Sequence, residues 1–139
     1  MNKITPGIRF LFGLIFLAFG AMGLFNLMPP PKPGDIPEAA MAFSKAMADT
    51  GYMLVLVKLT ETLCGLLLLL NMWVPLVLVI LFPVTLNILL FHSFLAPQGL
   101  PMAIVLIGLH IYLAFVHRRD YRALFVMRDN HETKQSMAV

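Results

Sequence analysis

The chain is 139 residues long, with hydrophobic residues at 60% of positions, charged residues at 12% and a formal net charge of +3. Soluble domains are about half apolar and about one quarter charged. This composition therefore excludes an ordinary soluble domain and indicates an integral membrane protein. The small positive charge reflects membrane topology and gives no reason to expect nucleic acid as a partner.

Four apolar tracts are long enough to cross a hydrocarbon core of about 30 Å, which needs about 20 helical residues. They are residues 8–28, 52–70, 74–94 and 100–117. The first tract resembles a secretory signal, but its apolar stretch exceeds the usual length of about 7–15 residues and three more tracts follow. We predict a retained first helix and an all-α fold, an integral membrane four-helix transmembrane bundle that forms a single domain over residues 1–139.

Lysine and arginine residues gather at the two ends of the chain. Lys3 and Arg9 lie at the N-terminus, and the tail at 118–139 carries Arg118, Arg119, Arg122, Arg128 and Lys134. The loop at 29–51 has two lysines against three acidic residues, a net charge of −1. Because basic segments stay on the cytoplasmic side, we predict an inner-membrane protein with both termini cytoplasmic and this loop outside.

The outer loop is predicted to contain a short helix from about Pro37 to Ala48. Asp35 with Glu38 three residues later forms a capping-box-like start, and a proline suits an early helical position. The apolar residues of this segment recur at spacings of four, three and four, namely Ile36, Ala40, Phe43 and Met47. One apolar stripe favours a helix on the outer interface or over the bundle end, rather than a dedicated docking site.

An acid and a base stand three residues apart inside the second tract. Lys58 and Glu61 share one helix face, and each charge alone would cost about 2.5–3.5 kcal/mol at the bilayer centre. The pair either neutralises itself to allow insertion or serves a function, and we favour the functional interpretation.

By the helical rise of about 1.5 Å per residue, the second, third and fourth tracts bring four polar residues to one depth. This candidate polar intramembrane site consists of Lys58, Glu61, Asn87 and His110. The face of the second helix that carries the charged pair, and the face of the fourth that carries His110, both contain small residues. We therefore expect these two helices to approach closely.

Thr85 and His92 are second-tier candidates on the third helix. Asn87 points about 140° away from His92 on an ideal helix, so we do not place these two in one site. Thr85 and Asn87 suit interhelical hydrogen bonding, and His92 suits the headgroup level. Pro83 is expected to bend this helix.

The chain shows no nucleophile triad, nucleotide-binding loop or metal-ligand cluster, and no catalytic or metal residue is assigned. Cys64 is the sole cysteine, which excludes an internal disulfide. His92 and His110 differ in predicted depth by about 10 Å, which argues against a bis-histidine haem held within the chain.

Several motifs follow one another in a specific order. They are Val57-Lys58-Leu59-Thr60-Glu61 with Gly65, Asn71, Pro83-Val84-Thr85-Leu86-Asn87 and Phe91-His92, after a glycine-containing segment at 13–23. Over about residues 8–125 this order resembles the DoxX-like family of small four-helix membrane proteins. The family takes its name from a subunit linked to thiosulfate and quinone oxidation, so the resemblance implies a redox association.

The leading hypothesis is a small accessory or quinone-interacting subunit of a membrane redox system, with lipid and redox-complex subunits as partners. Lys58 and His110 would donate hydrogen bonds to a quinone and Glu61 would exchange protons. The alternatives are a protein that handles a small molecule, ion or lipid, and a purely structural membrane partner. Gly13 and Gly20 align on one face of the first helix, which favours packing within the bundle over a homodimer seam, and a homo-oligomer is left open.

Overall fold

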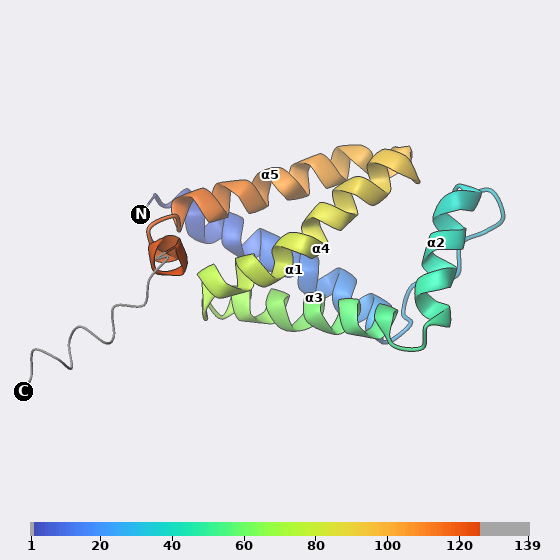
Figure 1. The fold of residues 1–139 in the computed structure, drawn as a ribbon, viewed down its shortest axis with the longest axis horizontal. Coiled ribbons are helices and arrows are strands. Elements are labelled where there is room, and N and C mark those ends of the chain that lie inside the picture. Colours follow the sequence, from blue (N-terminus) through green and yellow to red (C-terminus); the bar gives the residue numbers. More distant parts are fainter. Residues whose placement is uncertain (1, 126–139) are drawn as a thin grey trace, which may run out of the picture.

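The computed structural model describes residues 2–125, which fold into helices and connecting turns without a strand (Figure 1). Four helices occupy the four apolar tracts: α1 (Ile4–Leu24), α3 (Met53–Leu69), α4 (Val74–Phe94) and α5 (Leu100–Val116). The first loop contains α2 (Glu38–Asp49), and the short 3₁₀ turns η1 (Pro97–Gly99) and η2 (Asp120–Phe125) flank α5. The arrangement is the predicted helical membrane bundle. The predicted tail lies outside the described residues from position 126 onward.

Three of these helices, α1, α4 and α5 together with η1, are each long and apolar enough to cross a membrane. α3 has 17 residues, the short limit of the usual range of about 17–25. It runs alongside α1 and returns the chain to the end where α4 begins. α2 meets α3 at 93°, so it lies across one end of the bundle instead of lengthening the span (Figure 1). We call this end the α2 end.

The first helix begins and ends four residues earlier than the predicted tract at 8–28. Asn26 has a φ of 52°, and the Leu27 N–H donates to the Met22 carbonyl at 2.9 Å. A left-handed residue with this bond pattern is a common helix end, so α1 stops before the prolines are reached. Pro6 is tolerated in the first turn because the N–H that it lacks would have no helical partner there.

The predicted capping box at the start of α2 is wrong. Pro37 is the N-cap residue without a side-chain cap bond, and the Asp35 carboxylate instead accepts a hydrogen bond from the Lys32 N–H at 3.1 Å. Asp35 therefore stabilises the preceding turn rather than the helix.

α1 and α3 pack antiparallel, with their backbones in close contact along facing glycines. A methyl group on Gly65 would overlap the backbone of Leu17 and lie 2.7 Å from the Gly13 carbonyl oxygen. The expected close approach of α3 to α5 is wrong: within residues 2–125, α5 packs against α4 and α1 and has hardly any contact with α3. The α1 glycines admit the α3 backbone, and the small face of α3 is consequently occupied by α1.

The core fills the end of the bundle opposite α2. Its largest fully buried side chains include Phe12, Phe16, Leu68, Leu78, Leu81 and Leu113. At the same end, Arg9 donates hydrogen bonds to the Leu68 carbonyl at 3.0 Å and to the Asn71 side-chain oxygen at 2.6 Å. Asn71 has a φ of 57° and ends α3, so Arg9 ties the start of α1 to the α3–α4 turn.

Gly65→Ala tests the contact between α1 and α3. The added methyl group has no space between two backbones, and overpacking of this kind usually costs about 1–3 kcal/mol. We expect a lower thermal unfolding temperature in detergent. Gly108→Ala, where nothing lies within 4 Å of the added methyl group, is the matched control. Equal stability of the two variants would contradict the packing described.

Candidate functional site

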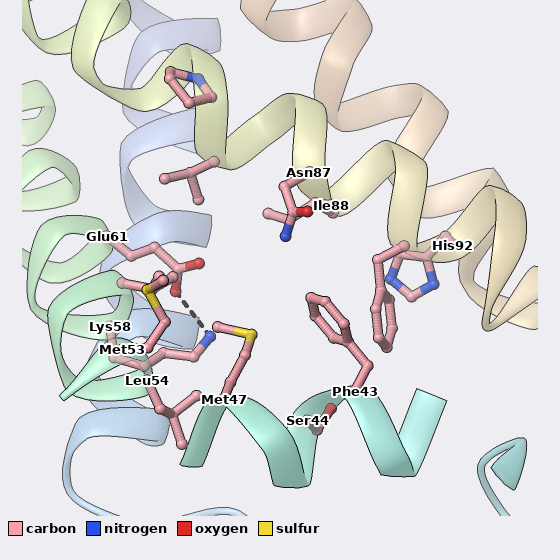
Figure 2. Close-up of a pocket in the computed structure, with 14 residues that line it drawn as sticks. Phe43, Ser44, Met47, Met53, Leu54, Lys58, Glu61, Asn87, Ile88 and His92 are labelled. Atoms are coloured by element: carbon pink, nitrogen blue, oxygen red, sulfur yellow. Dashed lines mark hydrogen bonds and ion pairs between the residues drawn. The ribbon is translucent and has the colours of Figure 1, made fainter. Parts of the chain in front are cut away.

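A cavity of about 530 Å³ lies between α2, α3 and α4 (Figure 2). Most of its wall is apolar, and the polar lining side chains are Ser44, Lys58, Glu61, Asn87 and His92. The apolar lining residues are Phe43, Met47, Met53, Leu54, Val57, Pro83, Val84, Ile88 and Phe91. The lining extends along α3 from Met53 to Glu61, and eight steps of about 1.5 Å make about 12 Å. The cavity therefore reaches from the α2 end to about the middle of the bundle.

Lys58 and Glu61 form an ion pair in the cavity wall. The Lys58 ammonium donates to Glu61 Oε2 at 2.9 Å, as the dashed line in Figure 2 marks. The Lys58 side chain is 21% exposed and that of Glu61 only 5%, so the lysine is the more accessible member. An ammonium has three N–H donors and this bond uses one. The pair is neutral as a whole, and it still offers hydrogen-bond donors to a ligand.

α2 forms one wall of the cavity and is held in place by the corner between α2 and α3. The Thr50 hydroxyl donates to the Met47 carbonyl at 2.7 Å and accepts from the Met53 N–H at 3.0 Å. Gly51 follows with a φ of 79°, a conformation that glycine adopts without strain. One threonine thereby links the last turn of α2 to the first turn of α3 and sets α2 across the cavity.

Phe43 and Met47 line the cavity from α2, a role that the sequence interpretation missed. The Phe43 and Phe91 ring centroids lie 5.6 Å apart, and this contact joins α2 to α4 in the cavity wall. Lys45 and Asp49 pair at 2.7 Å on the exposed face of α2. The spacing of the apolar stripe carries this signal, but by itself it indicates only contact with lipid or with the end of the bundle.

Asn87 and His92 line the same cavity, contrary to the expectation that their angular separation keeps them apart. Figure 2 shows Asn87 between the ion pair and His92, with both side chains on the cavity side of α4. His92 Nδ1 lies 3.0 Å from the Ala96 carbonyl. Because a carbonyl only accepts, Nδ1 carries a proton in this bond. No hydrogen bond of the Asn87 amide is found within residues 2–125.

His110 is not among the cavity-lining residues. It is 2% exposed, and its Nδ1 lies 3.0 Å from the Thr85 hydroxyl oxygen, which itself donates to the Leu81 carbonyl at 3.0 Å. The single hydroxyl proton is used in the second bond, so Nδ1 is the donor in the first. The Phe12 and Phe82 rings meet the imidazole edge-on. His110 and Thr85 thus form a buried link between α5 and α4.

The predicted four-residue layer therefore divides into two groups. Lys58, Glu61 and Asn87 share the cavity with His92, whereas His110 joins Thr85 elsewhere in the bundle. Within the described part of the chain, no three His, Cys, Asp or Glu side chains are grouped closely enough to hold a metal ion. The cavity groups suit an organic ligand with an apolar body and hydrogen-bonding oxygen atoms.

Together, the helices and the cavity define a small helical membrane protein with a partly polar chamber at one end. The DoxX family model matches residues 6–94, well over half of the chain, and the chain belongs to the DoxX family. This stretch begins in α1 and ends with α4, so it includes every cavity-lining residue. Neither the curated proteins nor the solved structures gave a match.

Lys58→Met tests whether the ion pair is a coupled unit. Glu61, whose side chain is 5% exposed in the wild type, then has no partner, and breaking such a pair on one side typically costs about 3 kcal/mol. We expect the double variant Lys58→Met with Glu61→Gln to recover most of the lost thermal stability in detergent. A double variant no more stable than Lys58→Met would show that the two charges are independent.

Proposed function

We propose that this DoxX-family protein binds the head group of a membrane-soluble quinone in the cavity between α2, α3 and α4. In this proposal it serves as a small accessory subunit of a redox system in the inner membrane. The observation that carries the proposal is the cavity itself, an apolar chamber of about 530 Å³ with an ion pair in its wall. Ligand sites of this kind are mostly apolar with a few placed polar groups.

The chemistry of the wall suits a quinone. Its ring is flat and apolar, and its two carbonyl oxygens accept hydrogen bonds. The Lys58 ammonium keeps N–H donors beyond the one held by Glu61, and the Asn87 amide adds two more donors. Phe43 and Phe91 offer aromatic surface to the ring. Glu61 would pass protons to the quinone when a partner protein reduces it, and accept protons from the quinol when a partner protein oxidises it.

The charge distribution supports an orientation for this site. Lys3, Arg9, Arg118 and Arg119 lie at the end of the bundle opposite α2, and basic residues favour the cytoplasmic side. The cavity would then open near the outer surface, with α2 lying in the outer interface. A quinone could enter this half of the bundle from the adjoining lipid.

A continuous transport path is less well supported. The end of the bundle opposite the cavity is filled by apolar side chains such as Phe12, Leu68 and Leu81, each fully buried. An ion that entered the cavity would therefore meet a packed core at about half the depth of the bundle. The cavity is better suited to binding a ligand than to passing one through.

Binding of a quinone analogue to the protein in nanodiscs tests the proposal. We expect saturable binding by the wild type and at least about tenfold weaker binding by Lys58→Gln, the effect of losing one hydrogen bond from a charged group. Lys45→Gln is the matched control, because Lys45 also pairs with an acid but lies on the exposed face of α2. Absence of binding by folded wild type, or equal loss in both variants, would refute a quinone site here.

A further inference from the structure

We propose that Gly23 on α1 is a positioning residue for the cavity, and that it holds the Lys58 ammonium on Glu61. The inference rests on the proposed function in one respect, that the correctly held ammonium is what the ligand binds. It adds α1 to the three helices that line the cavity. Gly23 itself is not a lining residue.

The contact lies between the α1 backbone and the aliphatic stem of Lys58. A methyl group on Gly23 would lie 2.6 Å from Lys58 Cδ, 2.8 Å from Cε and 3.1 Å from Cγ. The lysine stem thus fills the space that any larger residue at position 23 would occupy. The glycine forms a notch, and the stem lies in it.

The Lys58 side chain is helped by this notch because of the direction in which a helical lysine tends to extend. Helical side chains tilt toward the N-terminus of their helix, which for α3 is the α2 end of the bundle. A lysine near a membrane surface also tends to extend toward the interface. Glu61 lies one turn further along α3, its own side chain tilts back toward Lys58, and the ammonium meets it at 2.9 Å. The notch at Gly23 keeps the stem beside α1, where this bond can form.

Gly23 differs from the other glycines between α1 and α3 in the kind of atom that an added methyl group would meet. Added methyl groups on Gly13, Gly20 and Gly65 would meet backbone atoms of the facing helix, which cannot move without separating the helices. At Gly23 the three nearest atoms all belong to the flexible Lys58 side chain. Gly23→Ala should therefore leave the fold intact and displace the lysine.

Two measurements on Gly23→Ala test the inference, with Gly7→Ala as control. Gly7 is on the same helix, and nothing lies within 4 Å of its added methyl group. The first measurement needs no ligand: the acylation rate of Lys58 by an amine-reactive reagent, resolved by peptide mass spectrometry with Lys45 as internal reference. A Lys58 side chain displaced from the Glu61 carboxylate offers its free amine more readily, so we expect several-fold faster acylation in Gly23→Ala, with Lys45 and the unfolding temperature unchanged.

The second measurement is binding of the quinone analogue in nanodiscs. Gly23→Ala is expected to bind about tenfold more weakly than Gly7→Ala, as for the loss of one charged hydrogen bond. Equal acylation rates, or equal affinities where the wild type binds, would overturn the inference. If folded wild type binds no analogue, the proposed quinone site fails, and acylation alone still decides whether Gly23 positions Lys58.

Discussion

The close approach of the α1 and α3 backbones is the constraint on which the rest of the structure depends. Gly13 and Gly65 face each other where no side chain fits, and Gly20 lies against the backbone of Thr62. This contact fixes the rotation of α3. Glu61 then lies beside Gly20 and still lines the chamber between α3 and α4. A different rotation of α3 would point the charged pair at lipid, where it would be costly.

Polar side chains within the spans are satisfied in two different ways. Most hydroxyl groups bond to their own helix: Thr60, Thr62, Thr85 and Ser93 each donate to the carbonyl four residues earlier. Such local bonds use the hydroxyl proton, so these groups can only accept a further hydrogen bond. Lys58 and Asn87 keep unused N–H donors, and both line the cavity. The cavity wall thus offers donors to a ligand, and packed apolar side chains fill the other half of the bundle.

The sequence predicts the bounds of the helices better than it predicts which helices pack against one another. Apolar length placed α3, α4 and α5 within one residue of their observed ends, because the bilayer permits little else for such tracts. Periodicity also gives the face on which Gly65 and His110 lie. It does not reveal which helix covers that face. The sequence pairs α3 with α5, whereas α1 covers α3 in the structure. His110 shares the predicted depth of the ion pair but does not line the cavity with it. The corner at Thr50 and Gly51, which brings Phe43 over the cavity, likewise depends on backbone geometry that no periodic pattern records.

α5 lies apart from the cavity because α1, and not α5, packs against α3. α5 contributes no residue to the cavity, and the DoxX model match ends with α4 at residue 94. α5 is nevertheless tied to the bundle by polar bonds at two levels, from Tyr112 to Thr5 on α1 at 3.0 Å and from His110 to Thr85 on α4. Apolar surfaces alone do not specify helix partners in lipid, because lipid tails are as apolar as leucine. The hydrogen bond of the buried His110 fixes α5 against α4, which forms one wall of the cavity, so this histidine is accounted for by helix assembly.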